Sequence, residues 1–210
     1  MSKELLAAID QHDASRVKAL LAGGADPNEP QSQRLGLRPL QVAINELSEG
    51  GGLDVVLALL EHGADVNAWN VGRDVTPLLV AVFEGQQAAV EALLKVGADP
   101  NVCSSEGDTP LRACAGAGNL GIATLLLGAG ATRTINDWGG LTGYTALGHA
   151  ARRLDLPMIK LLLDAGADPR APDEDGLPAH YRLPPRDESD SQAWDAAFEL
   201  LGGAKDRMPS

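Results

Sequence analysis

The fold is decided by the stretch Leu93-Leu94-Lys95-Val96-Gly97-Ala98-Asp99-Pro100-Asn101, which recurs along the chain. Close copies lie at residues 20–28 and 59–67, shorter ones at 126–131 and 162–169, and a degenerate one at 200–205. The glycine before the alanine falls at positions 24, 63, 97, 130 and 166, so successive copies are 39, 34, 33 and 36 residues apart. A period in this range indicates stacked structural repeats, each of which buries its apolar face against its neighbours.

Each copy of this stretch predicts the end of one helix and a turn toward the next repeat. The two leucines lie on the buried face of the helix, and the glycine takes the left-handed conformation that ends it. In the Asp99-Pro100-Asn101 segment, proline fixes φ, and we expect Asp and Asn to bond their own backbone.

A second motif keeps a fixed phase with the first and predicts the start of a helix in each repeat. Its threonine caps the helix, its proline occupies the first helical position, and its leucine begins the buried face. A small residue three positions after the leucine allows neighbouring helix pairs to approach closely. The motif occurs at residues 76–78, 109–111 and 145–147, with Arg38-Pro39-Leu40 as a variant.

Together the two motifs resemble the ankyrin repeat, whose pattern is Thr-Pro-Leu-His-x-Ala followed by a second helix ending in Leu-Leu and then Gly-Ala-Asp-x-Asn. The resemblance covers nearly the whole chain. It implies an all-α ankyrin-repeat solenoid of stacked helix-turn-helix units with protruding β-turns. We expect a single domain over residues 1–206, with a capping repeat at 2–28, repeats at 29–67, 68–101, 102–134 and 135–170, a degenerate last repeat at 171–206 and a tail at 207–210.

Several segments depart from the family pattern. Residues 48–52 are expected to form a short flexible insertion, the turn at 31–37 is irregular, and the turn at 136–144 is enlarged. Pro184 and Pro185 are expected to shorten the first helix of the last repeat, because proline removes a helix hydrogen bond. Where the pattern is regular, it predicts helices at residues 3–11, 14–22, 77–83, 87–95, 120–127 and 192–201.

Composition limits the classes of partner. Hydrophobic residues make up 44% of the chain but aromatic residues only 3%, which argues against a large ligand pocket lined with rings. The net charge of −12 disfavours nucleic acid and makes basic proteins or peptides the more natural partners. The alternative is that this charge only keeps the protein soluble.

Targeting and crosslinking signals are absent from the sequence. Two cysteines, Cys103 and Cys114, are too few for a disulfide scaffold and suit a reducing compartment. The N-terminus lacks the features of a signal peptide, and no apolar run is long enough to span a membrane. We therefore expect a cytoplasmic protein, without membrane attachment and monomeric.

No catalytic constellation stands out, so the chain is not expected to be an enzyme or to hold a metal or cofactor. The sequence has neither a His-x-x-x-His pair nor a Cys-x-x-Cys pair, and its glycine-rich segments lack the Lys-Ser/Thr of a phosphate loop. His62 is expected to be structural. The resemblance implies the same for His180, whose ring is expected to tie neighbouring turns together.

The remaining route to function is recognition of a partner protein, the commonest use of the family that the chain resembles. In ankyrin arrays the turn tips and the exposed face of the first helices form a concave surface. Carried over by motif position, the tips comprise Trp69, Asn70, Arg73, Asp74, Ser105, Glu106, Asp108, Asp137, Trp138 and Tyr144, and the helix face comprises Asn45, Glu46, Phe83, Glu84, Arg152 and Arg153.

Four of the seven aromatic residues, namely Trp69, Phe83, Trp138 and Tyr144, belong to this predicted surface. Trp and Tyr are frequent energetic anchors of interfaces. The alternatives are that Trp138 and Tyr144 pack their own long turn and that Phe83 is buried against the next repeat. The pair Arg152-Arg153 either clamps a partner carboxylate or is a solvated helix face.

The sequence thus favours a non-enzymatic protein-interaction module. A narrower hypothesis is an inhibitor or immunity-type protein that neutralises an enzyme or toxin. A third hypothesis is a structural or assembly spacer that associates through its ends, motivated by Trp194 and Phe198 on the closing helix.

Overall fold

A computed structural model describes residues 2–30 and 36–203, and the chain divides into two compact units, Met1–Ser105 and Glu106–Ser210. Within the described residues, each unit consists of helices and turns, with one isolated β-bridge between Gly139 and Tyr144. The predicted all-α fold of paired helices is confirmed. Most of the irregular turn at 31–37 and the tail at 207–210 lie outside the described residues, and the division into six repeats of one domain stays a prediction.

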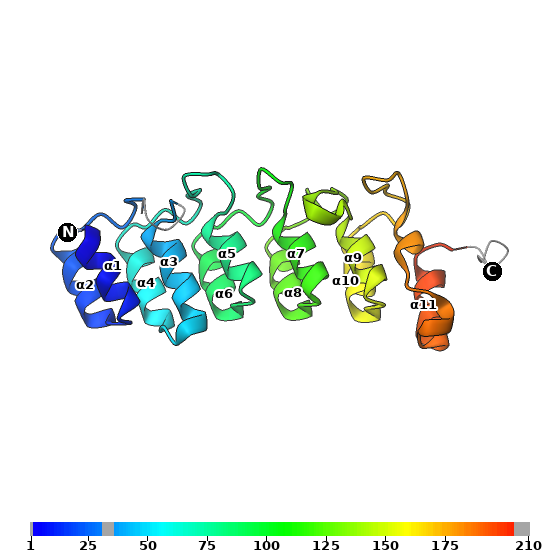
Figure 1. Cartoon of the computed structure of the whole chain (residues 1–210), viewed down its shortest axis with the longest axis horizontal. Helices are drawn as coiled ribbons and strands as arrows, with labels where there is room; N and C mark the ends of the chain where they lie inside the picture. The colour runs from blue at the N-terminus through cyan, green and yellow to red at the C-terminus, as the bar shows by residue number, and fades with distance from the viewer. Residues whose placement is uncertain (1, 31–35, 204–210) are drawn as a thin grey trace. The chain divides into compact units, whose positions relative to one another are not determined.

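The first unit contains three helix pairs (Figure 1). First helices pack on first helices, α1 on α3 and α3 on α5, and second helices pack in the same way, α2 on α4 and α4 on α6. The bounds are α1 (Ser2–Asp10), α2 (Ala14–Ala22), α3 (Pro39–Glu46), η1 (Leu47–Glu49), α4 (Leu53–Glu61), α5 (Pro77–Phe83) and α6 (Gln87–Lys95).

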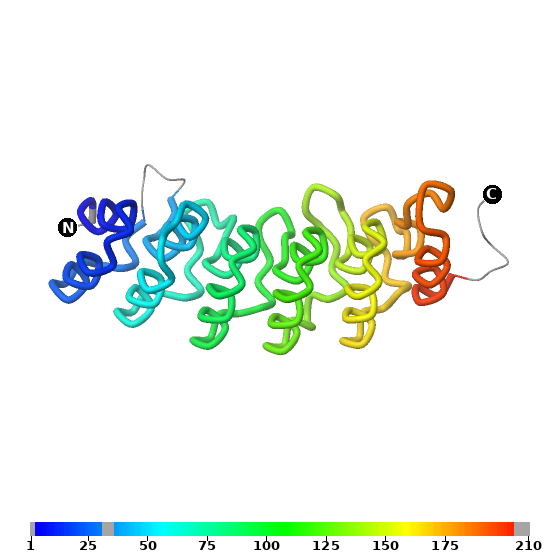
Figure 2. Tube along the Cα trace, turned by 90° about the horizontal axis from the view of Figure 1, so that it is seen from below, coloured from blue at the N-terminus to red at the C-terminus, as the bar shows by residue number. Residues whose placement is uncertain are grey.

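The second unit repeats the same hairpin, which can be followed along the trace in Figure 2. Here α7 packs on α9, α9 on η3, α8 on α10, and α10 on the closing helix α11. The bounds are α7 (Pro110–Ala117), α8 (Leu120–Gly128), η2 (Gly140–Thr142), α9 (Ala146–Arg152), α10 (Leu156–Asp164), η3 (Ala179–Arg182), η4 (Arg186–Glu188) and α11 (Ser191–Leu200).

The predicted helix bounds are correct to within one residue. The match is complete for α2, α5 and α6, and it is shifted or extended by one residue for α1, α8 and α11. The threonine caps explain this accuracy: the hydroxyl of Thr76 accepts from the N–H of Leu79 at 3.3 Å, and that of Thr145 from the N–H of Gly148 at 3.0 Å. At the variant start, Gln41 takes over the cap, since its Oε1 accepts from the N–H of Arg38 at 2.7 Å.

The turn after each second helix uses its Asp and its Asn differently, which corrects the expectation that both bond locally. Asp65 Oδ1 does accept from the nearby N–H of Asn67, at 3.0 Å. The Asn67 amide instead reaches the next repeat, donating to the carbonyl of Gly97 at 3.1 Å and accepting from the N–H of Asp99 at 2.9 Å. Asn28 bridges to the repeat that follows it in the same way, at 2.9 and 2.7 Å.

The segment at 48–52 is not the flexible insertion that was expected. Residues 47–49 form η1, and the N–H of Gly51 donates to the carbonyl of Glu46 at 2.7 Å. The Ser48 hydroxyl donates to Glu84 Oε2 at 3.2 Å and accepts from Gln86 Nε2 at 2.9 Å. These bonds tie the segment to the third repeat.

The last repeat loses its first helix, as the two prolines predict, and keeps only the short η3. The implied role of His180 is not seen, because its Nδ1 is buried without a hydrogen-bond partner among the described residues. The ring instead packs edge-on against Phe198, with 5.9 Å between centroids. His62 is structural as expected, with Nδ1 2.8 Å from the carbonyl of Ala58.

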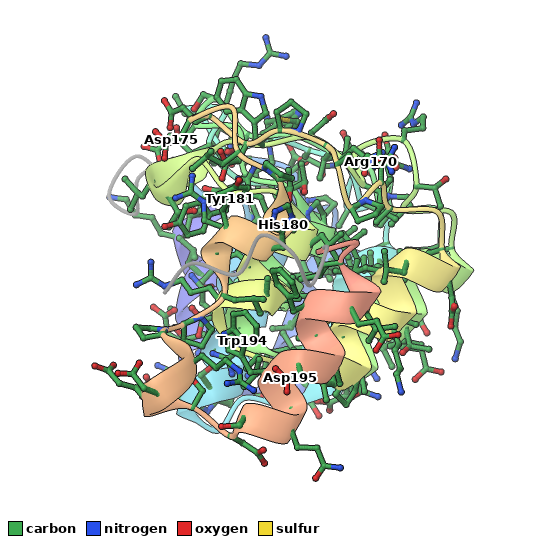
Figure 3. All side chains as sticks on the ribbon, turned by 90° about the vertical axis from the view of Figure 1, so that its right-hand side faces the viewer. Arg170, Asp175, His180, Tyr181, Trp194 and Asp195 are labelled. Atoms are coloured by element: carbon green, nitrogen blue, oxygen red, sulfur yellow. The ribbon has the colours of Figure 1, made fainter. Side chains whose placement is uncertain are left out.

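The closing helix α11 buries the aromatic pair that motivated a self-associating end. Trp194 stacks on Phe198 with 4.9 Å between ring centroids, and its Nε1 donates to the carbonyl of Pro184 at 2.8 Å. Figure 3 views this end of the chain, with Trp194 and Asp195 labelled on α11. The side chains of Trp194 and Phe198 are both buried, so the apolar face of α11 is already covered by its own unit.

No helix among the described residues is long and apolar enough to cross a membrane.

The bridging asparagines yield a stability prediction. Asn67→Ala removes two hydrogen bonds between adjacent repeats, and we expect it to lower the free energy of unfolding by about 1–2 kcal/mol. Asn45→Ala is the matched control, because no side-chain bond of Asn45 is present among the described residues and its loss should change stability little. Urea unfolding followed by circular dichroism measures both, and equal losses would contradict the bridging role.

Candidate functional site

The enlarged turn at residues 136–144 is anchored on both sides within the second unit. Its Gly140 N–H donates to the carbonyl of Glu106 at 2.8 Å, and its Gly143 carbonyl accepts from the N–H of Glu174 at 3.0 Å. The antiparallel bridge between Gly139 and Tyr144 closes its base. The turn is therefore hydrogen-bonded to the turns that precede and follow it.

Arg112 fills the space beneath this turn. Its side chain is only 2% exposed, and Nη2 donates to Asp108 Oδ1 at 2.7 Å. The backbone comes so close that a Cβ on Gly139 would lie 2.9 Å from Nη1, and φ at Gly140 is +62°. The two glycines are thus required by close approach and by a left-handed backbone, and not by any phosphate site.

Tyr144 is the centre of a polar and aromatic cluster at the start of α9. Arg152 Nη1 donates to its hydroxyl at 3.1 Å, and the Arg182 guanidinium lies 4.5 Å from its ring centroid. The His149 ring meets it edge-on at 5.4 Å, while His149 Nε2 lies 3.1 Å from Thr142 Oγ1. Tyr144 is therefore half-buried and packs against side chains of α9 and η3.

Trp138 and Leu141 lie on the same turn and remain exposed. The Trp138 side chain is 50% exposed, so it does not pack away inside the turn. Leu141, at the tip in η2, is 99% exposed and was not singled out by the sequence analysis. We call Trp138, Leu141, Tyr144, Arg152 and Arg153 the turn-five surface.

The cluster also lowers the pKa of one histidine. Burial is the largest cause, and the positive charges of Arg112 and Arg152 add to it, so that the pKa of His149 falls to about 4 in spite of Asp108. At neutral pH this ring is uncharged. Burial likewise raises the pKa of the Cys114 thiol to about 12, so that residue is inert, while Cys103 is exposed.

In the first unit, the predicted tip residue Asn70 is buried, at 4% exposure, and this part of the prediction is wrong. Its Oδ1 accepts from the N–H of Asp74 at 2.7 Å and of Val75 at 3.1 Å. The side chain therefore shapes its own turn and offers nothing to a partner. Trp69 is half-buried, whereas Arg73 and Asp74 are exposed.

The predicted helix face of the first unit is partly available. Phe83 is 49% exposed, which excludes the alternative that it is buried, and Glu84 beside it is exposed as well. Asn45 and Glu46 are half-buried, and Glu46 lies 3.2 Å from the ring of His12. Among the remaining predicted residues, Ser105, Glu106 and Asp137 are exposed and Asp108 is half-buried.

Sequence reasoning missed the buried charges of the second unit. Arg112 and Asp173 are both buried, and Asp173 pairs with Arg182, whose Nη2 also donates to Asp175 at 2.7 Å. A signal was present in the acidic segment at 173–175. The exposed Tyr181, beside Arg182 in η3, was missed too.

The described residues contain no group of three or more His, Cys, Asp or Glu side chains able to hold a metal ion. What both units present instead is a series of helix pairs with protruding turns, the architecture of a repeat protein that binds through its surface.

Comparison with known proteins agrees. The chain matches the profile described as ankyrin repeats (3 copies) over residues 5–102 and 78–173. It therefore belongs to the ankyrin repeat family, whose domains are generally protein–protein interaction modules and typically non-catalytic.

The curated relatives are longer than this chain. It is 38% identical over 141 residues to a zinc finger CCCH domain-containing protein of Oryza sativa, covering 65% of this chain and 20% of the relative. It is 36% identical over 130 residues to a putative ankyrin repeat-containing protein of Treponema pallidum, covering 61% of this chain and 42% of the relative. The chain thus spans less than half the length of these curated relatives.

Solved structures match over nearly the whole chain. The ankyrin repeat protein EF0377 superposes with a TM-score of 0.78 at 25% identity, covering 96% of this chain and 98% of that one. The ankyrin repeat domain of Bcl-3, described as a member of the IkappaB family, gives a TM-score of 0.76 at 26% identity, covering 95% and 81%.

His149 gives the cluster a pH signature. Because its pKa is lowered from 6.5 to about 4, the unfolded chain binds more protons between these values, and stability falls as the pH falls through that window. For this half-exposed ring we expect a loss on the order of 1 kcal/mol between pH 7 and pH 5. His149→Gln should show a smaller loss in urea unfolding at the two pH values, and an unchanged loss would contradict this assignment.

Proposed function

We propose that this chain binds a partner protein through the turn-five surface of its second unit, without catalysing a reaction. The observation that carries the proposal is the exposure of two large apolar side chains, Trp138 and Leu141, on one hydrogen-bonded turn. Covering an exposed apolar side chain with a partner removes apolar surface from water, which is favourable. A preformed turn loses little conformational entropy on binding. Large apolar anchors on a rigid support are typical of interface hot spots.

The first unit is a second candidate contact surface. Phe83 and Glu84 are exposed at the end of α5, on the helix face that ankyrin domains commonly use. We infer that Phe83 contributes to binding as well. The Phe83→Ala variant described below compares its contribution to binding with that of Trp138.

An inhibitor or immunity-type protein that neutralises an enzyme or toxin is the narrower form of this proposal. It draws support from a similarity of 30% over 151 residues to a protein named NF-kappa-B inhibitor alpha, from Sus scrofa, covering 70% of this chain and 48% of that protein. In both forms the mechanism is occlusion of a partner surface. The spacer hypothesis loses its motivation, since Trp194 and Phe198 are buried by their own unit.

The proposal predicts that one partner depends on two side chains. Affinity capture from lysate of the source organism should recover a partner with the wild-type chain and lose it with Trp138→Ala/Leu141→Ala. Removing two anchors is expected to weaken binding by about 2–4 kcal/mol, roughly 30- to 700-fold in affinity. The variant should unfold at nearly the wild-type temperature, because neither side chain is part of the core.

Leu120→Ala is the matched control, because Leu120 is an exposed leucine of the same unit at the start of α8. It should keep the partner. A partner retained by the Trp138→Ala/Leu141→Ala variant would overturn the assignment to turn five, and Phe83→Ala would then show whether the first unit carries the contact.

A further inference from the structure

Two adjacent arginines at the end of α9 carry charge that no described carboxylate neutralises. Arg152 is the last residue of α9 and Arg153 is its C-cap, and both are exposed. Within residues 2–30 and 36–203, neither forms a salt bridge. Their hydrogen bonds go to neutral groups, the Tyr144 hydroxyl at 3.1 Å and the Gly116 carbonyl at 3.4 Å.

Other arginines of this unit are treated differently. Three of them form salt bridges with one or two carboxylates of the protein. These are Arg112 with Asp108 at 2.7 Å, Arg182 with Asp173 and Asp175, and Arg186 with Asp195 at 2.9 Å. The pair at the end of α9 differs from these three arginines, because it places two adjacent cations without a salt bridge in an acidic chain of net charge −12.

Both guanidinium groups are also held in place. The Arg152 guanidinium lies 5.8 Å from the Tyr144 ring centroid in addition to its bond to the hydroxyl. Arg153 lies across the end of α7, where a Cβ on Gly118 would be 2.5 Å from its Nη2. Each bond uses one N–H of a planar fork with several donors, so most donors remain open toward solvent. Donors held in this way lose less rotamer entropy on binding than a free surface lysine.

The positive potential of the pair reaches into the cluster behind it. Arg152 is one of the two charges that lower the pKa of His149 after the larger effect of burial. Arg112 is the other, and Asp108 opposes them. Asp108 pairs with Arg112 and not with Arg152.

The net charge of the chain does not prevent an acidic ligand from binding here. At physiological ionic strength the Debye length is about 8 Å, so exposed carboxylates farther away are largely screened. At contact, a charge-assisted hydrogen bond is stronger than a hydrogen bond between neutral groups. The local pair therefore decides binding, and the distant negative charge mainly slows the approach of an acidic partner.

Exposed apolar and aromatic side chains lie on the enlarged turn and in η3, beside the exposed acidic residues Asp137 and Glu174. Tyr181, next to Arg182 in η3, is 62% exposed and is labelled in Figure 3. The Arg182 guanidinium packs 4.5 Å from the centroid of the Tyr144 ring. With Leu141 and Trp138 on the turn before α9, cationic and apolar groups alternate over a short stretch of the unit.

We propose that Arg152 and Arg153 bind the carboxylates of an acidic segment of the partner protein, with large apolar side chains of that segment packing on Leu141 and Trp138. This inference rests on the proposed function and specifies the chemistry of the partner. It reverses the expectation from net charge alone, which favours a basic partner.

Selection from a display library of short random peptides on the whole chain tests the proposal. Peptides enriched on the wild type should contain more Asp and Glu than the unselected library, together with large apolar residues. Synthetic copies of enriched peptides should bind at least 10-fold more tightly than versions with Gln for Glu and Asn for Asp, corresponding to about 1.4 kcal/mol. Their binding should weaken as salt rises from about 0.05 to 0.3 M.

The variant Arg152→Glu/Arg153→Glu should lose the enriched acidic peptides. Lys160→Glu/Arg170→Glu is the matched control, because it makes the same change in net charge at two exposed positions of the same unit. The control should retain binding within about 3-fold. Enrichment of neutral or basic peptides, no enrichment at all, or an equal loss in the control would each overturn the proposal.

The outcome is separable from the proposed function. Peptides that lack acidic residues but are lost with Trp138→Ala/Leu141→Ala would support the binding surface and refute its preference for carboxylates. Peptides that depend on Arg152 and Arg153 but not on Trp138 or Leu141 would refute the apolar half of the proposal.

Discussion

The bridging asparagine is the interaction on which this repeat architecture depends. Asn28 and Asn67 each hold the start of the following turn by one donated and one accepted hydrogen bond. In the second unit, Asn136 Oδ1 accepts from the N–H of Asp168 at 2.8 Å. A small side chain thus satisfies backbone groups of the neighbouring turn, and it sets the spacing between neighbouring pairs. Apolar burial supplies the driving force, but it does not by itself fix that spacing.

Because an asparagine fixes the spacing at the start of each turn, variation is confined to the residues that follow it in the turn. The enlarged turn at 136–144 is accommodated without altering α9, since a buried guanidinium fills the space beneath it and two glycines let the backbone close over it. Burial of a charge is favourable only when it is paired, and Asp108 pairs with Arg112. The turn is therefore a fixed projection, and its apolar tip is presented and not tucked away.

The motifs of this sequence predicted the helices almost residue by residue because their determinants are local: a threonine cap, a proline at the first turn, a glycine at the end. Asn70 and Asn67 show the limit. Both are asparagines in turns, yet one side chain folds into its own turn and the other reaches a neighbour, a difference set by which backbone groups lie near in space. The sequence likewise could not predict which aromatic side chain of the enlarged turn is exposed. Trp138 and Tyr144 share this turn, but it is Tyr144 that packs against Arg182 and His149.

The positions of individual charged residues explain the chemistry of this surface better than the net charge of the chain does. Exposed charges farther apart than about 8 Å are largely screened from one another at physiological ionic strength. Several arginines of the second unit form salt bridges that stabilise the fold. Arg112 pairs with Asp108 beneath the enlarged turn, and Arg182 pairs with Asp173 and Asp175. Had Arg152 and Arg153 served only stability, pairing with one of the many available carboxylates would have stabilised them further. Their bonds to a hydroxyl and a carbonyl orient them while leaving the charge intact, as recognition of a carboxylate requires.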